Sequence, residues 1–326
     1  MNSVIENIKS TPRVFLSNLN TPIEECSRIN KIYPDGAKLF IKRDDFIGSL
    51  VWGNKLRKLE FAIADAIKEQ ADTIITCGGV QSNHARITAQ ICKRLGLNCE
   101  LVHNGEEPDI PTGNHKVNRL LNISMHYVDS REERDYKMAE ISQNLIEKGR
   151  RPYVIPLGAS NDKGCLGFVE AINELKQQEK SLNIKFDYIV HATSSAGTQA
   201  GLELGKRIYG MEHIKIIGIS ADNSVDEIGD TILDCANPLS ERLGITFRMS
   251  KTDFNIDTGF IGPGYGIASK ESDEAIKFFS ENEGIILDTT YTAKAAAGLL
   301  NYIRNGKFEK GKNVLFWHTG GLIGIL

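Results

Sequence analysis

One junction in this chain reads HATSSAGTQAGLELG (residues 191–205), in which a short apolar run passes through small and hydroxyl residues into a helical pattern. In open α/β sheets, ligands bind where the carboxyl ends of strands meet the N-termini of helices. The junction therefore predicts a strand, a helix and a ligand site between them.

Two further junctions have the same form, CGGVQSNHAR (77–86) and WHTGG (317–321). Short β-branched runs, which predict strands, lie at 38–42, 73–77, 98–103, 153–156, 188–191, 214–220 and 314–318. Between them, apolar residues recur at steps of three and four, for instance across residues 56–67 and 87–95, as in amphipathic helices. This alternation predicts an α/β fold with parallel sheet and helices on its faces.

The length and charge of the chain limit its partners. Its 326 residues exceed the size at which one core usually stops growing, so we expect two domains. A formal net charge of -3, without a run of basic residues, offers no electrostatic basis for binding DNA, RNA or an anionic membrane. We expect a small-molecule partner, no nucleic acid and no membrane association.

The cysteines and the N-terminus indicate a compartment. None of the six cysteines falls in a CxxC pair, so we expect no disulfide framework, and we expect no metal site. The N-terminus MNSVIENIKSTPRVFLSN lacks a basic start followed by an apolar stretch, and no run of about eighteen apolar residues occurs. These features predict a reduced, cytoplasmic location.

The loop of the first junction consists of Thr193, Ser194, Ser195, Ala196, Gly197 and Thr198. Its hydroxyl and amide groups can donate to a phosphate, which the small side chains allow to approach the backbone. Because the loop has neither the lysine of GxxxxGK[ST] nor the spacing of GxGxxG, we expect a phosphate other than that of ATP or a nicotinamide dinucleotide. A tight turn before a closely packed helix is the alternative.

Lys55 opens the segment KLRKLE directly after Gly53 and Asn54. A lysine that bonds to a carbonyl carbon must lose its proton, so its pKa has to fall from about 10.4 toward about 7 to 8, on the order of 4 kcal/mol. A helix N-terminus and the neighbouring cations Arg57 and Lys58 both disfavour the ammonium form. The alternative is that Arg57 and Lys58 form the solvated face of the helix.

Other candidate polar groups lie at the remaining loops. Tyr265 lies in the glycine turn GPGYGIAS, and Tyr291 precedes a helix of small residues; such tyrosines position a substrate, transfer protons or simply fill space. Ser82 or Asn83 can cap the helix of the second junction and leave amides free for a carboxylate. Thr319 stands beside two glycines, where its hydroxyl either meets a heteroaromatic nitrogen or merely closes the last strand.

The chain resembles the D-cysteine desulfhydrase and 1-aminocyclopropane-1-carboxylate (ACC) deaminase family in GNKLRKLE, GGVQSNHAR, TSSAGTQAGL, GPGYGI, LDTTYTAKAA and HTGG, which occur in this order. The resemblance implies pyridoxal 5'-phosphate (PLP) as cofactor. It also implies the tryptophan-synthase-β-like fold (fold type II), with two three-layer α/β/α domains and the cofactor between them. The expected parts are a large cofactor domain of residues 1–55 and 165–326 and a small mobile domain of residues 56–164, in a homodimer.

Roles for individual residues follow from the same resemblance. It makes Lys55 the Schiff-base lysine, with Asn54 close to the cofactor. It puts Ser82, Asn83 and His84 at the substrate carboxylate and the cofactor ring.

The resemblance also makes residues 193–198 the phosphate-binding loop and puts Thr319 at the pyridine nitrogen. Tyr265 and Tyr291 match the two active-site tyrosines of the family. In the loop, Ser194 and Ala196 replace glycines. If the backbone at Ala196 needs a positive φ, then either the local conformation differs or phosphate affinity suffers.

A second departure precedes the lysine, where Val51 and Trp52 replace the usual small residues. Two positions discriminate within the family, since the ACC deaminases have QSNQ and Tyr-Glu where the desulfhydrases have QSNH and Tyr-Thr. Here these positions are His84 and Thr292. A glutamate there can protonate the pyridine nitrogen and strengthen the electron sink that opening an unactivated ring requires, whereas threonine cannot.

The resemblance therefore favours a PLP-dependent lyase that performs α,β-elimination on a small amino acid, with D-cysteine converted to pyruvate, sulfide and ammonia. ACC deaminase and L-cysteate sulfo-lyase are the alternative activities. An alternative of another class is a non-catalytic protein that binds an amino acid or PLP.

Overall fold

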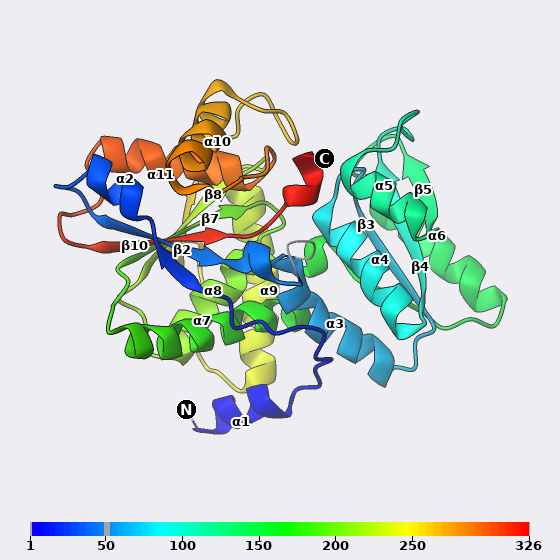
Figure 1. Ribbon diagram of the computed structural model, residues 1–326. Coiled ribbons are helices and arrows are strands. Elements are labelled where there is room, and N and C mark those ends of the chain that lie inside the picture. The colour runs from blue at the N-terminus through cyan, green and yellow to red at the C-terminus, as the bar shows by residue number, and fades with distance from the viewer. Residues whose placement is uncertain (1, 49–52, 326) are drawn as a thin grey trace.

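The computed structural model describes residues 2–48 and 53–325, so Val51 and Trp52 lie outside the described residues. Two sheets lie next to each other, and each carries helices on both faces (Figure 1). The predicted α/β class, with parallel sheet, is confirmed.

The larger sheet has six strands in the described residues, in the order β1-β2-β10-β7-β8-β9. They are β1 (Ile23–Glu25), β2 (Lys38–Arg43), β7 (Tyr188–Thr193), β8 (Lys215–Ser220), β9 (Asn255–Asp257) and β10 (Asn313–His318). Neighbours pair in parallel, except that β1 runs antiparallel to β2 at one edge. At the centre, Phe316 lies opposite Ile41 on one side and Val190 on the other, and all three are buried, as expected for a parallel sheet covered on both faces.

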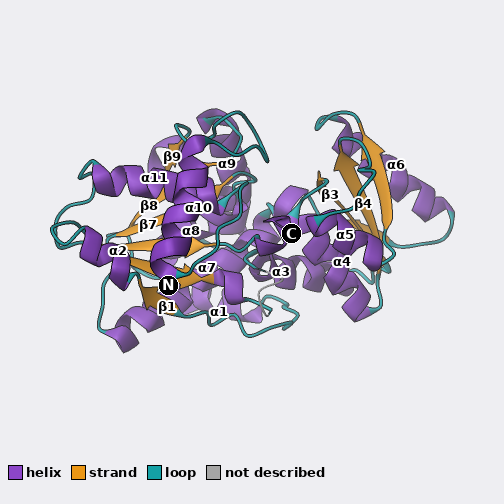
Figure 2. Ribbon diagram, turned by 45° about the horizontal axis from the view of Figure 1, so that its top comes forward, coloured by secondary structure: helices purple, strands orange, loops and turns teal. Residues whose placement is uncertain are grey.

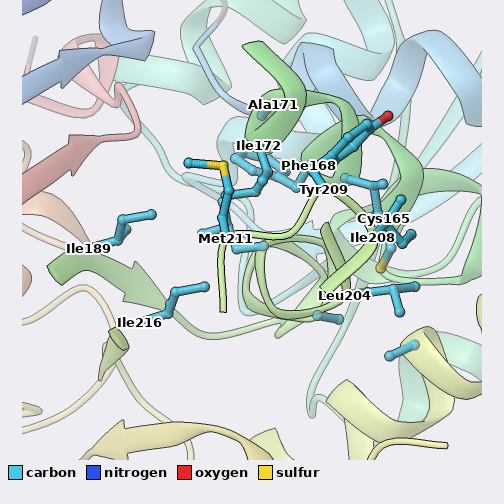
Figure 3. Close-up of a cluster of buried hydrophobic side chains, with 14 of the residues drawn as sticks. Cys165, Phe168, Ala171, Ile172, Ile189, Leu204, Ile208, Tyr209, Met211 and Ile216 are labelled. Atoms are coloured by element: carbon cyan, nitrogen blue, oxygen red, sulfur yellow. The ribbon is translucent and has the colours of Figure 1, made fainter. Parts of the chain in front are cut away.

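Helices cover both faces of the larger sheet. One face packs on α1 (Asn2–Ser10), α7 (Asp162–Leu182), α8 (Gly197–Ile208) and α9 (Val225–Leu243). The other face packs on α2 (Ser27–Ile32), α10 (Lys270–Glu283) and α11 (Thr292–Arg304). Figure 3 shows part of the first core, where Phe168 and Ile172 of α7 pack with Leu204 of α8 and with Ile189 and Ile216 of the sheet.

The smaller sheet is parallel throughout, with the order β5-β4-β3-β6 in the described residues. Its strands are β3 (Thr73–Gly79), β4 (Asn98–Asn104), β5 (Ser124–Val128) and β6 (Pro152–Val154). Its helices are α3 (Lys55–Lys68) and α4 (Asn83–Leu95) on one face, α5 (Gly113–Leu120) against α4, and α6 (Glu133–Glu147) on the other face.

Helix α3 joins the two halves and is buried around most of its circumference, because it lies between the sheets (Figure 2). The predicted amphipathic pattern is therefore incomplete. Arg57 and Lys58 are buried, whereas Ile67 at the end of the pattern is 44% exposed. Helix α7 approaches α3 so closely that a Cβ at Gly167 would lie 2.0 Å from the Arg57 carbonyl oxygen, which explains why glycine is needed there.

All seven predicted strands are present, with ends that differ by up to two residues from the prediction. The strands that sequence analysis missed, β1, β5 and β9, all lie at sheet edges. The domain boundaries and the mobility of the smaller part remain predictions. Each of the six cysteines is buried and free, and no described helix combines the length and apolar character needed to cross a membrane.

Candidate active site

A cavity of about 310 Å³ opens between the two sheets, at the carboxyl ends of their strands. Of the residues that sequence analysis predicted for the site, those that line it are Asn54, Lys55, Ser82, Asn83, His84, Thr193, Ser194, Ser195, Ala196, Thr198, Tyr265, Tyr291 and Thr319. Gly197, the remaining predicted residue of the 193–198 loop, is not among the lining residues. Residues from three junctions far apart in sequence thus meet at one place.

Lys55 is the first residue of α3, and its side chain is half-buried at the wall of the cavity. The side-chain amine of Lys55 forms no hydrogen bond or ion pair with the rest of the described chain. Burial, and secondly the charge of Lys58, lower the pKa of Lys55 well below its usual range. The amine can therefore be neutral at a pH at which an exposed lysine stays protonated.

The neighbouring cations do not form a solvated face. Arg57 is 2% exposed, and its guanidinium contacts Asp44 and Glu174, each at 2.7 Å. Lys58 is fully buried, and its Nζ donates to Ser160 Oγ at 3.1 Å. Burial lowers the pKa of Lys58, for which no carboxylate partner exists among the described residues. Lys58 rather than Arg57 is thus the cation that acts on Lys55.

The loop of residues 193–198 leads into α8 through Ala196, which has φ +58° and caps the helix with no side-chain hydrogen bond. This backbone position does adopt the left-handed conformation, which costs an alanine about 1 to 2 kcal/mol. Ala196 thus adopts the positive φ that sequence analysis considered for this position. Because the cap is an alanine, its side chain accepts from none of the first amides of α8. The Gly197 amide donates to the Ser195 carbonyl at 2.7 Å, and the amides that follow it in the first turn remain available for an anion.

Polar groups gather behind this loop. Ser160 Oγ lies 3.1 Å from Ser195 Oγ and accepts from the Gly197 amide at 3.3 Å. A Cβ at Gly197 would lie 2.7 Å from Lys58 Nζ, so glycine lets the cation approach the loop. Thr193 Oγ1 is buried and has no hydrogen-bond partner in the part of the chain that the structure describes. Together these groups form a donor-rich cradle that suits a phosphate.

The second junction carries a cap and an uncharged imidazole. Ser82 Oγ caps α4 by accepting from the Ala85 amide at 3.2 Å, as predicted, which leaves the hydroxyl proton free for another acceptor. The Thr76 hydroxyl donates to the Ile155 carbonyl at 2.7 Å and must therefore accept from His84 Nε2, 2.8 Å away. Burial, and then the charges of Lys55 and Lys58, lower the pKa of His84 well below its usual range. His84 is thus neutral, with its proton on Nε2.

Two tyrosines meet across the cavity. The hydroxyl oxygens of Tyr265 and Tyr291 lie 2.5 Å apart, and their rings meet edge to face with centroids 5.8 Å apart. Burial raises the pKa of both phenols, and that of Tyr291 is raised well above its usual range. The pair is therefore protonated near neutral pH and can donate but not accept a proton.

The remaining predicted residues tie the loops together. The backbone N–H of Asn54 donates to the Thr319 carbonyl at 3.1 Å, and its side-chain Nδ2 donates to Thr198 Oγ1 at 3.3 Å. Thr319 lines the cavity beside it. Thr292 is buried against Asp288, to which its hydroxyl donates at 2.6 Å, and it does not line the cavity.

Sequence analysis missed an ion pair at the cavity. Arg131, in the loop before α6, contacts Asp222, which follows β8, at 3.0 Å. Its guanidinium lies 5.1 Å from the centre of the Tyr265 ring. This contact joins the smaller sheet's half to the larger one. Neither residue has a local signal in the sequence, because Arg131 is one of several charges in the run DSREERD (129–135) and Asp222 is one acidic residue after a strand. Only the tertiary structure brings them together.

The sequence pattern of pyridoxal-phosphate-dependent enzymes matches residues 14–320, and the chain therefore belongs to this family. Within it, the chain is 36% identical over 315 residues to the D-cysteine desulfhydrase of Yersinia enterocolitica, an alignment that covers 95% of this chain and 94% of the relative. The predicted resemblance, the class of enzyme and the cofactor are thereby confirmed.

Solved structures agree with this assignment. A crystal structure of an ACC deaminase homologue is 35% identical, covers 100% of this chain and 97% of its own, and superposes with a TM-score of 0.91. The serine racemase of maize is 17% identical, with 98% and 94% coverage and a TM-score of 0.65, so this likeness shows the fold alone. The predicted fold type II is confirmed.

The residues present fit the cofactor of this family. The orphaned Thr193 hydroxyl, the uncapped start of α8 and the buried cation Lys58 suit its phosphate. The unpaired amine of Lys55, whose pKa is lowered, suits its aldehyde.

The depressed pKa of Lys55 makes the stability of the cofactor-free protein depend on pH. Between its folded pKa and about 10.4, the unfolded chain binds more protons, so the free energy of unfolding rises with pH. We expect apo Lys55→Met to be more stable than the apo wild type near pH 7, and the gap to narrow toward about pH 10. Urea denaturation of both proteins across this range measures the gap.

Lys277→Met provides the control, because the Lys277 side chain is 74% exposed. It should change stability little at any pH. If the difference in the free energy of unfolding between Lys55→Met and the wild type stays constant across this pH range, Lys55 titrates in the folded protein as it does in water.

Proposed function

We propose that this chain is a D-cysteine desulfhydrase, which converts D-cysteine to pyruvate, sulfide and ammonia. The observation that carries the proposal is the near full-length similarity to an enzyme of that name, combined with His84 and Thr292 at the two positions that separate desulfhydrases from ACC deaminases. The cavity volume of about 310 Å³ is suited to a small amino acid beside the cofactor.

In this proposal, Lys55 holds the cofactor aldehyde, residues 193–198 and the first amides of α8 hold its phosphate, and Thr319 meets its ring nitrogen. Pyridoxal phosphate, when bound, supplies the electron sink for a carbanion at the substrate α-carbon. A neutral hydroxyl at Thr319 leaves the ring nitrogen unprotonated, which suits loss of a good leaving group.

The protein's own groups then bind the substrate and move its protons. Ser82, Asn83 and the N-terminus of α4 bind the carboxylate. The amine of Lys55, freed when the substrate amine takes its place at the cofactor aldehyde, is neutral and takes the α-proton. Tyr291 and Tyr265 are kept protonated by burial, and since one hydroxyl of the pair donates to the other, the second donates a hydrogen bond to the leaving sulfur. His84, neutral and held by Thr76, adds no charge to the substrate pocket.

ACC deaminase is the second candidate, favoured by the similarity to the solved ACC deaminase homologue. Ring opening calls for an acid at the pyridine nitrogen, and Thr292 supplies none. Its hydroxyl is also already bonded to Asp288. We therefore place this activity second.

Turnover assays separate these candidates. Purified holoenzyme is incubated with D-cysteine, L-cysteine, ACC and L-cysteate, and sulfide, sulfite and α-keto acid are measured. We expect sulfide and pyruvate from D-cysteine, and loss of this activity in Lys55→Ala, because no other described lysine lines the cavity. Turnover of ACC or L-cysteate in preference to D-cysteine would refute the assignment, and Lys277→Ala serves as the variant that should keep full activity.

Lys58 is a further residue that we propose supports the cofactor phosphate, from behind the loop. The Lys58→Met variant should bind PLP at least about tenfold more weakly, since a charge-assisted interaction is worth about 1.5 to 3 kcal/mol. The same change removes a buried charge, so the apoenzyme should become more stable. Fluorescence titration of the apoenzyme with PLP and urea denaturation measure the two effects, and affinity equal to wild type would exclude the role.

We also propose a cytoplasmic homodimer in which residues 56–164 form a mobile domain on the cofactor domain of residues 1–55 and 165–326. Free buried cysteines support a reducing compartment, and the separate cores of the two sheets support independent movement. Sedimentation equilibrium should give twice the 36.1 kDa chain mass. The mass of a monomer would contradict the proposed homodimer.

X-ray scattering should show a smaller radius of gyration with bound D-alanine. An unchanged radius of gyration would contradict the proposed mobile domain.

A further inference from the structure

Asn114, the second residue of α5, is 1% exposed and bonds to the loop that begins α4. Its Oδ1 accepts from Arg86 Nε at 2.8 Å. Its Nδ2 donates to the Gln81 carbonyl at 2.8 Å and to Asn83 Oδ1 at 3.0 Å. One buried amide thus contacts three members of the QSNHAR segment, one of which lines the cavity.

Chemistry permits only one orientation of these amides. Arginine is a donor only, so the oxygen of Asn114 must face Arg86. The nitrogen of Asn114 then faces Gln81 and Asn83, and since the Gln81 carbonyl can only accept, this orientation is fixed twice. Asn83 must therefore present its oxygen to Asn114, which leaves its NH₂ group as what it can offer the cavity.

The loop is also held from the other side. Gln81 Oε1 accepts from the Asn114 backbone amide at 2.8 Å, and Gln81 Nε2 donates to the Thr112 carbonyl at 3.2 Å. The Gln81 side chain thereby caps the first turn of α5, whose own N-cap residue Thr112 forms no side-chain cap. Hydrogen bonds therefore join α5 to this loop from both sides and hold Asn83 in its orientation.

We propose that Asn114 is a positioning residue, which together with Arg86 fixes Asn83 as a hydrogen-bond donor toward an oxygen anion in the cavity. The anion is either the carboxylate of the amino-acid substrate or an oxygen of the cofactor ring. This inference rests on the proposed function in so far as it requires an amino acid and PLP to bind in this cavity.

Two variants test the orientation. Asn114→Asp keeps the acceptor for Arg86 but loses the donor to Asn83, whose amide then turns its nitrogen to the new carboxylate and its oxygen to the cavity. Asn83→Asp keeps the acceptor for Asn114 and replaces only the NH₂ group. It therefore tests the donor with the buried network intact, should Asn114→Asp fold poorly.

Binding without turnover provides the readout. The visible absorbance of the bound cofactor is followed as the holoenzyme is titrated with alanine and with alaninol, in D and L forms. Alaninol carries the same amine but no carboxylate, so the ratio of the two dissociation constants isolates the carboxylate. A separate titration of each apoenzyme with PLP reports on the cofactor oxygen.

If the anion is the substrate carboxylate, both variants should lose about 10- to 100-fold of the preference for alanine, with alaninol binding unchanged. If it is the cofactor oxygen, both should lose a similar factor in PLP affinity instead. Gln90→Glu is the matched control, since Gln90 Oε1 accepts from Arg86 Nη1 at 2.8 Å, and it should change neither quantity.

Two outcomes overturn the inference: both variants matching wild type in both titrations, or Gln90→Glu reproducing their effect. Failure of the proposed function would give a different experimental result. If wild-type enzyme does not turn over D-cysteine but the variants still lose the carboxylate preference, the positioning role stands and the substrate assignment fails.

Discussion

The first turn of α3 carries three basic residues, Lys55, Arg57 and Lys58, and the rest of the site depends on how their charges are compensated or removed. Burying an unpaired charge is costly, so proteins pair such groups or shift their pKa values. Arg57 is paired with Asp44 and Glu174, whereas Lys55 and Lys58 have no carboxylate partner in the described residues. Lys58 therefore lies behind residues 193–198 without a negative partner, and the phosphate of the cofactor is suited to supply one.

The position of α3 between the sheets turns this local constraint into an active site. Its N-terminus meets the end of β10 and the start of α8 through Asn54, and its body packs on α7 where Gly167 allows close approach. The same helix contributes to the core of the smaller sheet. These basic residues thus lie where two separately packed halves meet, and the ion pair of Arg131 with Asp222 joins the halves at the cavity.

Burial also shifts the protonation of the proposed reacting groups toward their uncharged forms. It favours the uncharged forms of Lys55, His84, Tyr265 and Tyr291 alike. Near neutral pH the described wall of the cavity thereby includes a neutral amine, Lys55, and two phenolic acids, Tyr265 and Tyr291. An elimination that removes a proton from carbon and releases a sulfur group needs this combination.

Local patterns in the amino-acid order were sufficient for the α/β class, the central strands and the three junctions, because periodicity and the residue types at strand ends encode them. The edge strands β1 and β9 escaped, since three residues with one mostly open side carry no periodic signal. The sequence did not reveal how the buried charges are compensated, because Arg57 and Lys58 are adjacent in it. Carboxylates neutralise Arg57, whereas Lys58 lies behind residues 193–198. Likewise, Asn83 acquires its orientation from Asn114, thirty-one positions away. Such properties arise from contacts between distant segments in a medium of low dielectric constant, and no local pattern encodes them.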